Sequence, residues 1–85
     1  MREDELNEIL EARQSTYGDA SENFKKIGRI WAALLGLNGD IPAYQVALMM
    51  DAMKTVRCFA NPEHMDSWDD KVGYTRHGQD SVLYK

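Results

Sequence analysis

The stretch PAYQVALMMDAMKTVRCF, residues 42–59, decides the fold class. Pro42 suits the first turn of a helix, because the N–H group that proline lacks would find no partner there. The run from Val46 to Met50 is apolar on every side of such a helix. This pattern predicts a central, buried helix that reaches about Phe59.

Helical spacing also predicts helices on both sides of this stretch, at about 4–14, 21–35 and 62–77. Gly36 follows the second of these, where glycine commonly ends a helix. The apolar stripes of the last two helices contain the residues Phe24, Ile27, Ile30, Trp31, Leu34 and Leu35, then Met65, Trp68 and Val72. Trp31 and Trp68 are therefore expected in the core.

The predicted fold is all-α, a compact antiparallel bundle of about four helices. Asn61-Pro62 is expected to cap and begin the last helix, and Gly78 to end it. We expect one helical domain over residues 1–77 and a short C-terminal tail over residues 78–85. A chain of 85 residues buries a modest core, so partner subunits would add burial and a homo-oligomer is expected.

The charge and apolar content of the chain exclude several classes of protein. The net charge is -4, whereas a protein that binds duplex nucleic acid carries a basic surface. No apolar run approaches the ~18 residues of a membrane span, and the acidic start of the chain does not read as a signal peptide. The cytoplasm is the expected location. Cys58 is the only cysteine, and a small buried apolar role is the simplest expectation for it.

Two cations and two acids form the main candidate site. Lys54 and Arg57 are three residues apart on one helix, and Asp66 and Asp70 are four apart on the next. A short connection makes these helices antiparallel neighbours, so the acids are expected opposite the bases. One interpretation is structural, with interhelical ion pairs. The other is a ligand site, in which the cations bind phosphate and the carboxylates bind Mg²⁺.

The turn Tyr17-Gly18-Asp19 opens the predicted second helix, and free N–H groups at a helix N-terminus favour anions. Tyr17 is a candidate for stacking on a base, and Asn23 for a base edge or phosphate. The alternatives are core packing for Tyr17 and simple capping for Asn23. His64 near Asp66 lacks a second histidine or cysteine at ligand spacing, so zinc is not expected.

The order of these motifs resembles a group of small phage-encoded proteins of unassigned function, over roughly residues 13–74. The residues that carry the resemblance are Arg13, Tyr17-Gly18-Asp19, Asn23, Trp31, Val46 to Met50, Lys54, Arg57, Asp66-Ser67-Trp68, Asp70 and Gly73-Tyr74. From this resemblance and the site chemistry, the predicted ligand-binding set is Arg13, Tyr17, Asn23, Lys54, Arg57 and Tyr74.

More distantly, the group is similar to all-α nucleoside triphosphate pyrophosphohydrolases of the MazG type, which are oligomeric and magnesium-dependent. Their second acidic run is matched loosely by Asp66 and Asp70, but their Glu-Glu-x-x-Glu run is not, because Met50 to Lys54 offers a single acid. A Lys/Arg pair in place of acids keeps affinity for phosphate and weakens a metal site. The departure therefore favours binding over cleavage.

Three functions follow. The first is sequestration of a nucleotide or cyclic-nucleotide signal through a Lys/Arg phosphate clamp, in the manner of phage sponges that evade bacterial immunity, with no cofactor required. The second is a Mg²⁺-dependent nucleotide pyrophosphohydrolase built on Asp66 and Asp70. The third is a protein-binding inhibitor module without a small-molecule ligand, whose acidic surface would suit a basic partner.

Overall fold

The computed structural model describes residues 20–84, which fold into three helices and contain no strand. Residues 20–35 form the first of these helices, followed by α2 (Ala43–Ala60) and α3 (Met65–Leu83). The predicted helix at 4–14 lies outside the described residues. The all-α prediction is confirmed for the part of the chain that is described.

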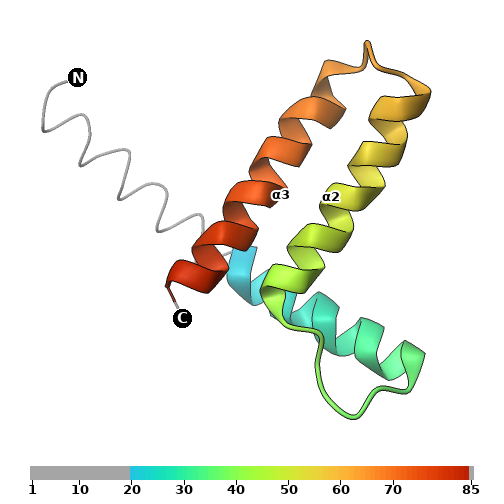
Figure 1. Cartoon of the computed structure of the whole chain (residues 1–85). Helices are drawn as coiled ribbons and strands as arrows, with labels where there is room; N and C mark the ends of the chain where they lie inside the picture. The colour runs from blue at the N-terminus through green and yellow to red at the C-terminus, as the bar shows by residue number, and fades with distance from the viewer. Residues whose placement is uncertain (1–19, 85) are drawn as a thin grey trace, which may run out of the picture.

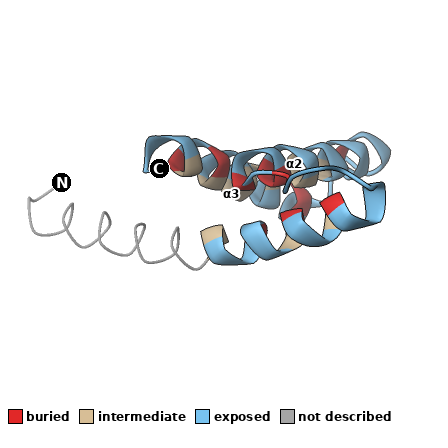
Figure 2. Cartoon of the chain, turned by 90° about the horizontal axis from the view of Figure 1, so that it is seen from below, coloured by how far each residue is buried: buried red, intermediate tan, exposed pale blue. Residues whose placement is uncertain are grey.

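The helices α2 and α3 form an antiparallel hairpin, and residues 20–35 cross one end of it (Figure 1). Viewed along the hairpin, the crossing helix lies on one side only, and no described helix covers the other side of the hairpin (Figure 2). Within residues 20–84, no helix is long and apolar enough to cross a membrane.

Gly36 ends the first helix, as predicted. Its φ of 70° lies in the left-handed region, which an L-residue with a side chain adopts at a cost. The N–H of Leu37 donates to the carbonyl of Ala32 at 2.9 Å and satisfies one of the last helical carbonyls. The chain then reaches Pro42, which is the N-cap of α2.

The core lies where residues 20–35 meet the hairpin. The buried apolar residues among those described are Phe24, Ala32, Ile41, Ala43, Val46, Ala47 and Cys58. The Phe24 ring packs on α3, 6.3 Å from the ring centroid of Tyr74 and 5.9 Å from that of His77. Burial of Cys58 agrees with the expectation for that residue.

Gly28 marks the closest approach of the first helix to the chain that precedes α2. Its carbonyl accepts a hydrogen bond from the N–H of Ile41 at 3.3 Å. A Cβ at this position would overlap the carbonyl oxygen of Ile41 and lie 3.4 Å from Cγ2 of Val46. Glycine is therefore required here by space, because neighbouring backbone occupies the place of a side chain.

The predicted bounds of the last helix are wrong at both ends. Pro62 lies in the turn that joins the hairpin, and α3 begins only at Met65, with His64 as its N-cap. Gly78 does not end the helix. It lies inside α3 and is buried where α3 crosses α2. A Cβ there would lie 3.4 Å from Cβ of Ala47, so small residues bring the two helices together. Residues 78–83, predicted as tail, are helical.

The expectation that α2 is buried all round is also wrong for the single chain. Val46 and Ala47 are buried, but Leu48 is 56% exposed and Met49 46% exposed. Trp68, expected in the core, is 45% exposed, and its indole N–H donates to the carbonyl of Pro62 at 2.9 Å.

Candidate functional site

Lys54 forms an ion pair with Asp70 between α2 and α3, with 2.9 Å between Nζ and Oδ2. The Lys54 side chain is 12% exposed and that of Asp70 is 46% exposed. The prediction that these helices oppose the bases to the acids is confirmed for this pair. The pair also agrees with the alternative in which these residues form interhelical ion pairs and bind no ligand, because the carboxylate neutralises the lysine.

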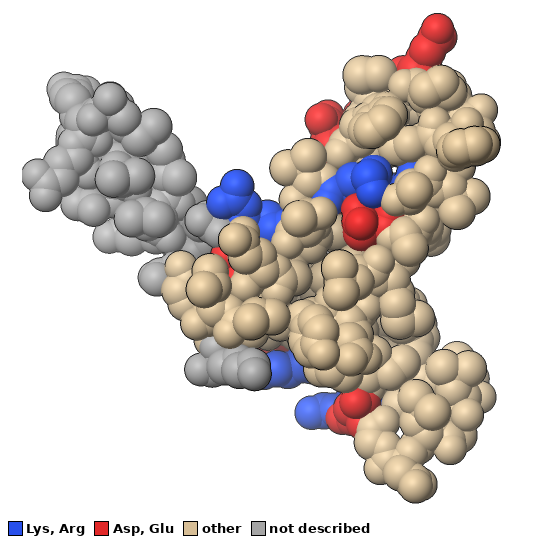
Figure 3. All heavy atoms as spheres, in the orientation of Figure 1, with Lys and Arg blue, Asp and Glu red and all other residues tan. Residues whose placement is uncertain are grey.

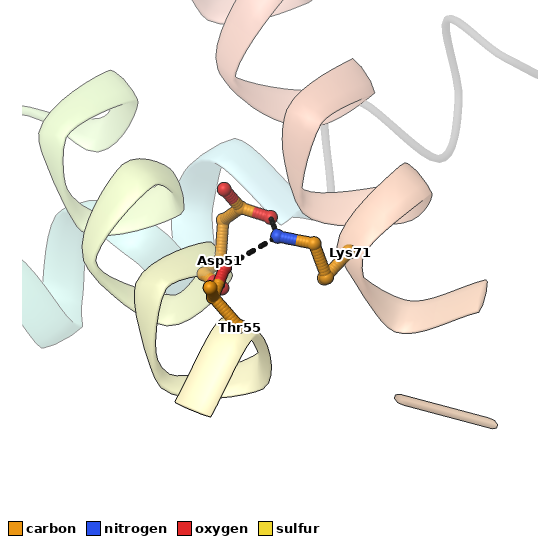
Figure 4. A network of polar contacts seen from close by, with 3 residues as sticks. All are labelled: Asp51, Thr55 and Lys71. Atoms are coloured by element: carbon orange, nitrogen blue, oxygen red, sulfur yellow. Dashed lines mark hydrogen bonds and ion pairs between the residues drawn. The ribbon is translucent and has the colours of Figure 1, made fainter. Parts of the chain in front are cut away.

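A second interhelical pair joins Lys71 to Asp51, at 2.8 Å. Lys71 Nζ also donates to the hydroxyl of Thr55, so that one ammonium group connects α3 to two residues of α2 (Figure 4). The side chains of Asp51 and Lys71 are 25% and 23% exposed. This network was not predicted from the sequence, although Asp51 and Thr55 share a helix face at i, i+4 spacing.

Arg57 stands apart from both pairs. Within the described part of the chain it forms no side-chain hydrogen bond or ion pair, and Asp66 does not meet it. It lies in the last turn of α2, where a cation is favoured by the helix dipole. Because no carboxylate neutralises Arg57, its guanidinium remains available to an external anion.

A pocket of about 260 Å³ lies beside Arg57, at the end of the hairpin. Its other lining residues are Ala60, Asn61, His64 and Ser67. Ser67 is fully buried, and its hydroxyl lies 2.9 Å from Nδ1 of His64, so this contact orients the imidazole ring. The pocket therefore combines a free guanidinium, a carboxamide and an oriented imidazole.

The N-terminus of α3 lies at the same pocket. No side chain caps it by a hydrogen bond, so its first backbone N–H groups are not satisfied by a cap. Such groups attract anions. Asp66 in the first turn partly opposes this effect by its own charge.

The other predicted ligand residues do not gather at this pocket. Tyr74 packs against Phe24 in the core region, and Asn23 is exposed on the first helix. Arg13 and Tyr17 lie outside the described residues. Asn61, His64 and Ser67 were not predicted as site residues. The pattern that points to them is a set of polar residues between the basic end of one helix and the start of the next.

The described residues contain no group of three or more histidine, cysteine, aspartate or glutamate side chains placed to hold a metal ion. Asp70 is engaged by Lys54, whereas Asp66 is exposed. A magnesium role for Asp66 and Asp70 stays a prediction.

Residues 4–81 match the family described as Domain of unknown function (DUF6378). A similar curated protein is the "Gene 55 protein" of Mycobacterium phage L5, which is 36% identical over 62 residues. The match covers 73% of this chain but 39% of that protein, so the chain spans about two fifths of the relative's length. No solved structure matches the chain at a significant level. The resemblance to phage-encoded proteins of unassigned function is confirmed.

Proposed function

The chain belongs to the DUF6378 family, and from this premise and the geometry around Arg57 we propose that it binds a phosphate-bearing nucleotide without cleaving it. The observation that carries the proposal is the unneutralised Arg57 beside the pocket at the hairpin end. A guanidinium gives phosphate two parallel hydrogen bonds, and His64 and Asn61 add donors around the same space.

The size of the pocket fits part of a nucleotide. Pockets for drug-sized ligands measure about 300–1,000 Å³, and this one is about 260 Å³. It would take one or two phosphate groups, while the sugar and base would lie over the surface of the hairpin. Sequestration of a nucleotide signal, as in phage evasion of host immunity, is the role that this binding would serve.

The ion pairing of a candidate metal-binding carboxylate favours binding over hydrolysis. Cleavage of a pyrophosphate bond needs metal ions that activate water and neutralise developing charge. Here one of the two candidate carboxylates, Asp70, already neutralises Lys54 at 2.9 Å. The pyrophosphohydrolase alternative requires that pair to open when magnesium binds.

Calorimetric titration of the full chain tests the proposal. Nucleoside triphosphates and cyclic dinucleotides would be titrated with magnesium and, separately, with a chelator, and the ligand would then be recovered and identified. Intact ligand bound in the presence of chelator supports the proposal. Ligand recovered cleaved, and only with magnesium, supports the enzyme alternative. No heat with any nucleotide overturns both and leaves the protein-binding alternative.

The substitution Asp70→Asn separates binding from hydrolysis. It removes the carboxylate that neutralises Lys54, which stands one helical turn from Arg57. We expect nucleotide affinity to rise by about two- to tenfold, because the local positive potential increases. Calorimetry of the variant measures this change, and Asp69→Asn, which removes the neighbouring acid, is the matched control.

A loss of affinity in Asp70→Asn with an unchanged circular dichroism spectrum would contradict the phosphate clamp. It would show instead that the Asp70 carboxylate takes part in binding, as a magnesium ligand does. The variant also leaves a largely buried Lys54 without its partner. We therefore expect a stability loss of about 1–3 kcal/mol, which thermal unfolding would measure.

A further inference from the structure

One side of the α2–α3 hairpin, the side away from residues 20–35, is apolar, and no other described element covers it. We define this open face by Leu48, Phe59, Trp68, Val72 and Val82, which are 56%, 91%, 45%, 67% and 51% exposed. In Figure 3 this face is turned toward the viewer, and it is mostly uncharged over both helices.

Shared hollows show that these residues lie on one face. Leu48 and Val82 line one hollow, Phe59 and Trp68 line a second, and Trp68 and Val72 line a third. The hollows follow one another along the line where α2 meets α3. The open face is therefore a continuous ridged surface, rather than scattered apolar side chains.

We infer that a second copy of this chain packs on the open face, so that two hairpins form a symmetric four-helix bundle. The described core explains the need for such a partner. Seven apolar residues are buried among those described, and three of them are alanines. A chain of this size with so small a core commonly gains stability by oligomerising.

The area of the open face fits a dimer. The exposed parts of its five side chains sum to on the order of 500 Å² of apolar surface, which is as large as the largest patch on a typical monomer. Polar residues that line the same hollows, such as Thr75 and Gln79, enlarge it toward the ~800 Å² that each partner buries in a stable interface. Phe59, at 91% exposure, is the natural anchor.

The charges of the open face favour a copy of the same chain over a charged partner protein. Asp51 and Lys71 lie along its middle and neutralise each other at 2.8 Å. A strongly basic partner would therefore meet no opposing field there, and an acidic partner would meet a single further cation among the residues that line the hollows, Arg76. A paired ion network inside the interface keeps its hydrogen bonds and fixes the register of the helices. The predicted N-terminal helix offers only three large apolar residues, Leu6, Ile9 and Leu10, too few to cover both helices.

Sedimentation equilibrium of the full chain between about 1 and 100 μM tests the inference. A specific dimer with a micromolar or lower dissociation constant is populated over this range of concentrations. We expect a dimer that Val72→Asp weakens about thirtyfold or more, because the variant places a charge among apolar interface side chains. Leu34→Asp is the matched control, because Leu34 is an apolar residue of the first helix, 78% exposed. It should leave the dimer unchanged.

Thr75→Arg gives a second variant that does not touch the core. It places like charges across the two-fold axis and should also yield a folded monomer by circular dichroism and sedimentation. A wild-type chain that stays monomeric at the highest concentration overturns the inference. So does a dimer that withstands Val72→Asp and Thr75→Arg but dissociates in Leu34→Asp. None of these outcomes depends on whether a nucleotide binds.

Discussion

We expect Gly28→Ala to destabilise the fold by about 3 kcal/mol or more, because a side chain at this position has no space. The added Cβ would overlap the carbonyl oxygen of Ile41 and lie 3.1 Å from the carbonyl carbon. These are backbone atoms, so they cannot move aside by a rotamer change. The hydrogen bond from Ile41 N–H to the Gly28 carbonyl holds the two segments in this close approach.

The substitution Gly73→Ala is the matched control for Gly28→Ala. Both glycines lie inside helices, and alanine is favoured over glycine there by about 1 kcal/mol. A Cβ on Gly73 would meet nothing within 4 Å, so this variant should gain about 0.5–1 kcal/mol. Chemical denaturation followed by circular dichroism measures both. Equal stability of the two variants would show that the first helix does not pack at Gly28 in solution.

Arg57→Ala has the largest expected effect on binding. The guanidinium would supply two charge-assisted hydrogen bonds to phosphate, and hydrogen bonds to charged groups contribute about 1.5–3 kcal/mol. We expect nucleotide affinity to fall by about 100-fold or more, measured by calorimetric titration. Stability should change by at most about 1 kcal/mol, because Arg57 is exposed and forms no ion pair with the described residues.

Two further variants are controls for Arg57→Ala. Lys26→Ala removes the same unit charge from an exposed position on the first helix, and affinity should fall by less than about threefold. Arg57→Lys keeps the charge but loses the planar fork, so its affinity should lie between those of the wild type and Arg57→Ala. If Arg57→Ala binds nucleotide as well as Lys26→Ala does, the pocket beside Arg57 is not the site.

The elements that local signals define were predictable from the sequence. Residues 21–35 show a wide apolar stripe that ends at a glycine, and within the described residues the helix runs to residue 35, directly before Gly36. Pro42 predicted the start of α2 to within one residue. In both cases the information lies within a few residues of the boundary, in backbone conformations that only certain residues favour.

The bounds of α3 depend on contacts made after folding. The N–H of Asn61 makes the last i→i−4 bond of α2, to the carbonyl of Arg57, and α3 begins only at Met65, so Pro62 lies in the connecting turn. Gly78 looks like a helix end in sequence, yet it is buried against Ala47 on another helix. A local pattern does not report such tertiary contacts.

The burial of α2 shows a further limit. The run Val46 to Met50 is apolar all round, but the single chain buries only Val46 and Ala47 fully. If the open face pairs with a second copy, the apolar pattern describes burial in the assembly rather than in one chain.

The candidate site was predicted in part, through helical spacing. The Lys54–Asp70 pair was expected from the i, i+3 and i, i+4 arrangement of cations and acids on neighbouring helices. Helical spacing did not reveal that Lys54 would be paired with a carboxylate and that Arg57 would not. Asn61 and His64 were missed because a short connection has no periodicity from which its orientation can be read.

The contacts of Phe24 also set the order in which the chain can fold during synthesis. Its ring packs on Tyr74 and His77, which leave the ribosome about fifty residues later. The α2–α3 hairpin, closed by the short connection of residues 61–64, has local contacts and should form rapidly once it emerges. The first helix therefore remains unpacked, with its apolar stripe exposed, until α3 has been synthesised. Ribosome-bound chains that end before Tyr74 should be cleaved readily by protease, whereas chains in which α3 has emerged should resist it.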